Sequence, residues 1–141
     1  IARLIHLEEV KNLDKVSTYK SFAHKVEKLK TELVNLLSKL KRSGHTIAGY
    51  GAAAKGNTLL NYYGIGNDIL DYIADQNTLK QGLYTPGTHV RVVSPKKIYQ
   101  DTPDYIVILA WNFAQEIMKQ QSDFRESGGK FILPVPEVRI A

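Results

Sequence analysis

The stretch TIAGYGAAAKGN, residues 46–57, decides the fold. Its first five residues form a short apolar run, which predicts a buried strand. The glycines and alanines that follow predict a tight turn, and a helical stretch is expected over residues 57–63. A buried strand that passes through a glycine-rich turn into a helix is the opening unit of an α/β domain with a parallel sheet.

Strand and helix patterns continue to alternate downstream. Further strands are expected over residues 70–74, 90–93, 105–110 and 130–133, and helices after Ser94-Pro95 and over residues 112–121. The run YIVILA at 105–110 is apolar on both faces, which is typical of a central parallel strand. We predict an α/β fold with a mostly parallel sheet of about five strands. If the strand order is 3-2-1-4-5, a ligand crevice lies between the first and fourth strands.

A long helix is predicted upstream, between an N-cap at Ser17 and a left-handed C-cap at Ser43-Gly44. Its apolar residues recur at spacings of three and four: Phe22, Val26, Leu29, Leu33, Leu36 and Leu40. This stripe fits either a helix that lies on the sheet or a helix–helix or dimer seam. Residues 1–16 show no clean period, so we expect a linker or irregular lead from a missing upstream domain, followed by one domain over residues 17–141.

The composition is that of an ordinary globular domain. It has 43% hydrophobic residues, a formal charge of +5 and no cysteine. The absence of cysteine excludes disulfides, cysteine-bound zinc and thiol catalysis, and it fits a cytoplasmic location. No apolar run approaches the roughly 20 residues of a membrane span. The positive charge suits an anionic ligand but is too small to demand nucleic acid, so we expect neither a nucleic acid nor a membrane partner.

The glycine segment is the main candidate for a binding site. It fails as a phosphate-binding Walker loop, because Asn57 stands where that motif needs lysine. It satisfies a dinucleotide fingerprint loosely through Gly49, Gly51 and Ala54, and Asp75 follows Gly51 by 24 residues, near the position of a ribose-binding carboxylate. It also suits an anion site, with Lys55 beside a helix start. A tight turn without a ligand remains the alternative.

The loop over residues 76–89 is long and polar, as binding loops often are, although a merely solvated loop remains open. His89 serves either acid–base chemistry or structure, and Trp111 either stacks on a ring or covers the core. No nucleophile–base pair and no metal-ligand spacing is visible, so the catalytic residues are unknown and no metal is expected in this chain. The candidate substrate-binding residues are Gly51, Ala52, Lys55, Gly56, Asn57, Asp75, Lys80, Gln81, Tyr84, Thr88, His89, Trp111 and Asn112.

Several of these segments together carry a family resemblance. They are residues 49–61, 80–89, 104–105, 109–112 and 128–132. With them the chain resembles, from about Tyr19 to Pro136, the C-terminal domain of the S-adenosylmethionine-dependent sugar C-methyltransferases, which act on nucleotide-linked deoxysugars. The resemblance implies a Rossmann-like, three-layer domain. Two positions depart from the family's pattern: Thr78 stands where proline is common, and Tyr63 where a small residue is expected.

The same resemblance implies the function. The full enzyme would consist of an N-terminal zinc-binding region, a central domain that makes most of the contacts to S-adenosylmethionine, and this domain. This domain would be inactive alone. Gly51, Lys55, Gly56 and Asn57 would form the anion loop, and the residues of the segment 80–89 would face a nucleotide-sugar held between the domains.

Two other functions stay open from the residues. The fingerprint of Gly49, Gly51, Ala54 and Asp75 suits a free-standing Rossmann-like module that binds NAD or another nucleotide. The long helix suits a non-enzymatic interaction module that docks through its apolar stripe.

Overall fold

A six-stranded sheet organises the molecule. The structure, a computed structural model, describes residues 1–141. The strand order is β3-β2-β1-β4-β5-β6, with every neighbouring pair parallel except β5 and β6. The strands are β1 (Ile47–Tyr50), β2 (Ile73–Ala74), β3 (Val92–Val93), β4 (Tyr105–Ile108), β5 (Lys130–Leu133) and β6 (Arg139–Ile140). The predicted α/β class and the order 3-2-1-4-5 are confirmed, and β6 is an additional strand that is too short to show a period in the sequence.

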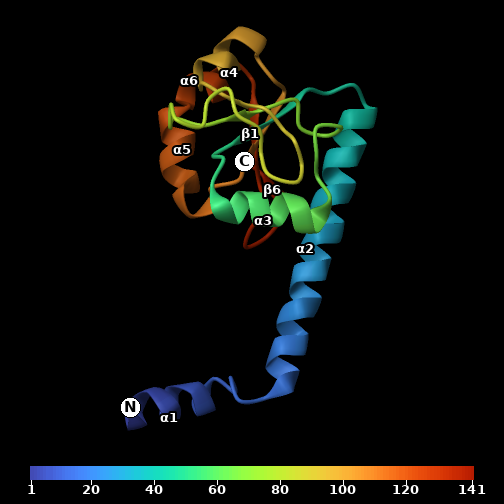
Figure 1. The fold of residues 1–141 in the computed structure, drawn as a ribbon. Coiled ribbons are helices and arrows are strands. Elements are labelled where there is room, and N and C mark those ends of the chain that lie inside the picture. Colours follow the sequence, from blue (N-terminus) through green and yellow to red (C-terminus); the bar gives the residue numbers. More distant parts are fainter.

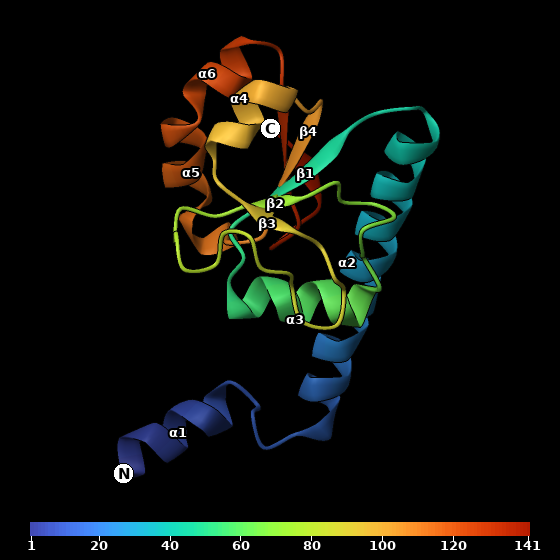
Figure 2. The same cartoon turned by 45° about the horizontal axis from the view of Figure 1, so that its top comes forward.

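Helices cover both faces of this sheet (Figure 1, Figure 2). On one face, Leu33, Leu37, Leu59 and Leu60 of α2 and α3 join one core cluster, and helices α4 to α6 contribute to a second cluster on the opposite face. This three-layer arrangement is that of a Rossmann-like domain. The helices are α1 (Ala2–Val10), α2 (Val16–Arg42), α3 (Ala54–Tyr63), α4 (Lys96–Asp101), α5 (Ala114–Gln120) and α6 (Ser122–Glu126), with a 3₁₀ turn η1 at Trp111–Phe113.

The long predicted helix, α2, lies on the sheet with its second half only. Leu33 and Leu37 are fully buried, whereas Phe22, at the start of the predicted stripe, is 65% exposed. The helix begins at Val16 with Lys15 as N-cap, not at the predicted cap Ser17, and no side chain caps it. Its end agrees with the sequence, because Gly44 adopts a φ of +85° just after the last turn. No helix of the chain, α2 included, is long and apolar enough to cross a membrane.

The segment expected to be irregular at the N-terminus is helical. α1 spans nine residues, and none of them is buried. Because no face of α1 packs on the domain, its sequence carries no apolar period that could have predicted it. Residues 1–25, which we call the N-terminal arm, extend away from the body of the domain (Figure 1).

Paired hydrogen bonds at the amino ends of β1 and β4 fix the register that positions the site. The Asp104 carboxylate accepts hydrogen bonds from the Thr46 N–H at 2.8 Å and the Thr46 hydroxyl at 3.0 Å. The Thr46 hydroxyl in turn accepts one from the Asp104 N–H at 3.0 Å. The hydrogen bond from the Thr46 N–H is the main cause that lowers the pKa of Asp104, helped by the nearby His45. With Ile47 opposite Tyr105, both strands leave the sheet at the same edge.

Candidate functional site at the carboxyl edge of the sheet

The glycine loop after β1 packs closely against the exit of β4. Gly51 has a φ of +92°, and a Cβ added there would lie 2.8 Å from the Ala110 Cβ. A Cβ added at Gly56 would lie 2.9 Å from the Leu109 Cβ, so α3 also begins in contact with the segment after β4. Packing alone therefore accounts for glycine at both positions, as it would in a tight turn that binds no ligand. Lys55 is not explained in this way.

Asp75, at the end of β2, is bound by the protein itself. Its Oδ2 accepts hydrogen bonds from the Ala52 N–H at 2.7 Å and from Lys80 Nζ at 3.2 Å, and its Oδ1 accepts one from the Asn77 N–H at 2.8 Å. Lys80 Nζ also donates to the Ala52 carbonyl at 2.9 Å, and the Gln81 amide donates to the Asp75 carbonyl at 2.9 Å. Asp75, Lys80 and Gln81 thus fasten the loop over residues 76–89 to the glycine loop.

These hydrogen bonds bear on whether Asp75 can bind the ribose of a dinucleotide. A ribose-binding carboxylate needs an oxygen that is free to accept a hydrogen bond from a sugar hydroxyl. Both oxygens of Asp75 already have donors, and its side chain is only 11% exposed. Three of the roughly four acceptor positions of the Asp75 carboxylate are therefore occupied by donors of the chain itself, which weighs against a ribose-binding role and against the free-standing NAD module.

The fastening predicts a stability effect. Asp75→Asn replaces the carboxylate by an amide and weakens its bonds to Ala52 and Lys80, so the free energy of unfolding should fall by about 1.5–3 kcal/mol. Asp68→Asn is the matched control, because Asp68 is exposed and makes no ion pair, and it should change stability by less than about 0.5 kcal/mol. Urea denaturation of the two variants measures the difference, and equal losses would contradict a structural role for Asp75.

Lys55 lies at the carboxyl edge of the sheet and has no carboxylate partner. Its Nζ lies 5.4 Å from the ring centroids of both Trp111 and Phe113. Among the ion pairs of the structure none involves Lys55, whereas Lys80 is paired with Asp75. No side chain caps α3, so the N–H groups of its first turn have no side-chain acceptor. A lysine beside an uncapped helix start favours a bound anion.

Four of the predicted site residues line two separate hollows. One is a crevice of about 330 Å³ between the carboxyl ends of β1 and β4, which Gly51 and Asp75 help to line. The other is a groove of about 680 Å³ between α2 and α3, which Lys55 and Trp111 help to line. Besides those two, the groove is lined by Phe22, Ala23, Val26, Leu29, Thr58, Leu59, Tyr62, Tyr63 and Val135; we call it the α2–α3 groove.

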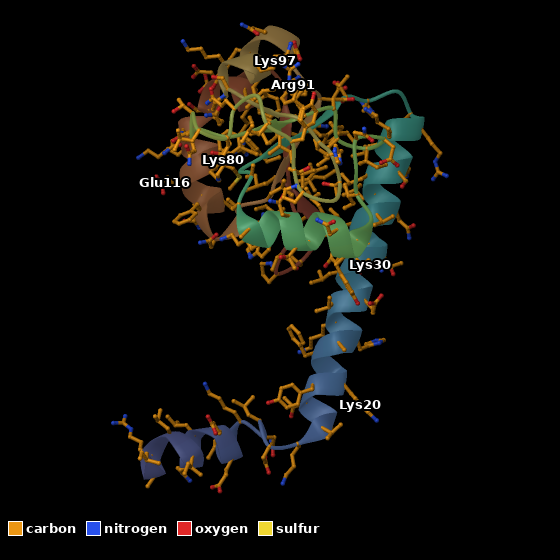
Figure 3. All side chains as sticks on the ribbon, viewed as in Figure 1. Lys20, Lys30, Lys80, Arg91, Lys97 and Glu116 are labelled. Carbon is orange, nitrogen blue, oxygen red and sulfur yellow. The ribbon has the colours of Figure 1, made fainter.

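Five polar or aromatic side chains of the crevice were missed by the sequence analysis: Tyr50, Gln76, Phe113, Glu116 and Gln120. The Gln76 amide donates to Gln120 at 2.9 Å, and the Gln120 amide donates to Glu116 at 3.0 Å, so these groups form a chain across the crevice. Glu116 comes from α5, opposite the loop that carries Lys80 (Figure 3). The spacing of Glu116 and Gln120 places both on one helix face, which was the available signal.

The remaining predicted residues line neither the crevice nor the α2–α3 groove. The loop that carries Tyr84, Thr88 and His89 is held to the second half of α3, where the Asn61 amide donates to the Pro86 carbonyl at 3.0 Å. The Tyr84 and His89 rings are exposed, with their centroids 6.2 Å apart. Asn112 is exposed and lines a third hollow. Asn57 turns inward, since its amide oxygen is buried without a donor.

Comparison with known proteins places this geometry in a family. Residues 1–136 match the C-methyltransferase C-terminal domain family, so the match includes the N-terminal arm. The C-methyltransferase NovU of Streptomyces niveus is 36% identical over 140 residues, which is 99% of this chain and 33% of the relative. The chain therefore spans about a third of the length of this curated relative. With nearly its whole length matched, the chain belongs to the family of C-methyltransferase C-terminal domains.

Proposed function

We propose that this chain is the substrate-holding domain of an S-adenosylmethionine-dependent C-methyltransferase that acts on a nucleotide-linked ketodeoxysugar. The observation that carries the proposal is Lys55, an ammonium without a carboxylate partner beside the uncapped start of α3. The phosphates of a nucleotide-sugar are the anions that suit this place. The printed name of the relative, C-methyltransferase, supports methyl transfer to carbon.

Each part of the site has a role in this proposal. Lys55 and the first turn of α3 hold the phosphates, and Trp111 and Phe113 present flat faces beside them. S-adenosylmethionine supplies an electrophilic methyl group. The sugar carbon next to the keto group loses a proton to a base, and its electron pair forms the new carbon–carbon bond as the methyl–sulfur bond breaks.

We assign the methyl donor to the preceding part of the polypeptide, because the chain matches a family of C-terminal domains and spans about a third of its relative. The base and a zinc-binding region are assigned there too, so the domain is inactive alone. The nucleotide-sugar is its small-molecule partner, and a cytoplasmic location is expected because both substrates are cytoplasmic metabolites.

The test is methyl transfer by the full-length protein. S-adenosylmethionine with a ¹³C-labelled methyl group is incubated with a panel of nucleotide-linked ketodeoxysugars, and the product is examined by NMR. We expect the labelled methyl on a ring carbon adjacent to the keto position. The matching nucleoside diphosphate without sugar should inhibit competitively and remain unmethylated. Label on oxygen or nitrogen, or no transfer to any member of the panel, would contradict the proposal.

A further inference from the structure

We propose that the α2–α3 groove and the apolar side chains of the N-terminal arm form the docking surface for the preceding part of the same polypeptide. The proposal rests on the proposed function, because it assumes a methyl-donor region upstream of residue 1. The groove has about 680 Å³ of volume, and its lining is apolar apart from Lys55 and Thr58. A contiguous apolar hollow, unlike single scattered apolar residues, is typical of an interaction site.

Two exposed aromatic side chains form part of the wall of the groove. Phe22 is 65% exposed and Tyr62 is 52% exposed, on the two helices that form the groove. Tyr62 is held in place, since its hydroxyl donates to the Glu27 carboxylate and its ring lies 4.7 Å from Lys30 Nζ. Fixed, exposed aromatic side chains are typical anchors of protein interfaces, because little conformational entropy is lost when they are covered.

The arm extends the same surface. A helix as short as α1 is marginal in water without tertiary contacts, and α1 has no buried residue. Before Phe22, which lines the groove, the arm extends clear of the body, as Lys20 does in Figure 3. The large apolar side chains exposed along it are Ile1, Leu4, Ile5, Leu7, Val10, Leu13, Val16, Tyr19 and Phe22.

The proposed occupant of the groove, the preceding part of the polypeptide, is inferred from the length of the relative. The chain covers 33% of that protein, so about two thirds of its length lies outside the match. The family is defined as a C-terminal domain, which places most of the remainder before residue 1, where the arm begins. A tethered partner reaches the groove at an effective concentration in the millimolar range, well above that of a second copy. Docking there also brings the preceding part against Lys55, where the substrate is proposed to bind.

Photocrosslinking of the full-length protein tests this occupant. Benzoylphenylalanine is introduced at position 22, in the groove, or at position 79, which is 84% exposed on the loop over residues 76–89. Position 22 should crosslink within one chain to a peptide that precedes residue 1, and position 79 should not. Crosslinks from position 22 to a second copy, seen as a band of doubled mass, would overturn the proposal, as would yields equal to those at position 79.

A matched pair of substitutions gives an independent measurement. Phe22→Ser and Leu79→Ser each remove an exposed apolar side chain, but only the first weakens the docking. In the full-length protein, proteolysis within residues 11–15 should become about tenfold faster in Phe22→Ser. Leu79→Ser should leave it unchanged, and equal rates in the two variants would overturn the proposal. Neither readout needs a substrate, so a failed methyl transfer alongside the expected crosslink refutes the proposed function and leaves the docking surface standing.

Discussion

Lys55→Gln raises KM for the nucleotide-sugar about 10- to 100-fold in the full-length protein, with kcat changed by less than about threefold. The substitution removes a charge-assisted contact to phosphate, which contributes about 1.5–3 kcal/mol. The contact is the same in the ground and transition states, so the loss should fall on KM. The substitution also removes the ammonium beside the Trp111 ring, a contact that contributes about 0.5–1 kcal/mol, so the free energy of unfolding should fall by no more than about 1 kcal/mol. Steady-state kinetics with varied nucleotide-sugar measure the effect.

The controls for this variant separate charge from shape. Lys55→Arg keeps the cation and should recover most of the affinity. Lys97→Gln removes a lysine on α4 that is paired with Asp101 at 2.9 Å, and it should leave KM unchanged. The KM of the parent protein should also rise with ionic strength, and this dependence should be weaker in Lys55→Gln. A KM within twofold of the parent value in Lys55→Gln would remove Lys55 from the substrate site.

Gly51→Ala should lower the free energy of unfolding by about 2–5 kcal/mol. A left-handed φ of +92° costs an alanine about 1–2 kcal/mol, and the contact of 2.8 Å with the Ala110 Cβ adds about 1–3 kcal/mol of overpacking. Gly44→Ala is the matched control, since its φ is +85° and nothing lies within 4 Å. It should lose only the first of these contributions. Urea denaturation of both variants gives the difference.

A double substitution isolates the steric contact. In Gly51→Ala combined with Ala110→Gly, the two Cβ atoms no longer meet, so Gly51→Ala should cost less stability in the Ala110→Gly background than in the parent protein. An equal cost in both backgrounds would show that the close approach of the glycine loop to the exit of β4 is not what requires glycine at position 51.

The fold was predictable because its central strands are short apolar runs between turn residues. Residues 47–50 and 105–108 are buried on both faces, and this is visible in the sequence. Boundaries were less predictable: α3 begins at Ala54 rather than at residue 57, because its start packs on Leu109 through Gly56. The predicted strands at 70–74 and 90–93 shrink to two residues each, although single hydrogen bonds to the neighbouring strands extend beyond them, such as that from the Asp71 N–H to the Ile47 carbonyl at 2.9 Å.

The site was predicted in part. Lys55 and Trp111 do meet, as a lysine after one central strand and an aromatic residue after the other should. The hydrogen bonds that the chain itself makes to Asp75 were not predicted, because its spacing from Gly51 says nothing of the fold-back of residues 76–89 that brings Lys80 to it. That contact depends on tertiary structure and has no local pattern.

The unbroken course of α2 limits how the full-length protein can move. Its 27 residues span about 40 Å as one continuous helix, from the arm to the sheet. Leu33 and Leu37 fix its second half in the core, so the helix cannot turn about Ser43-Gly44 without opening that core. The point at which the preceding part of the polypeptide can turn relative to the domain is therefore the segment 11–15, where a positive φ at Asn12 interrupts the helical backbone.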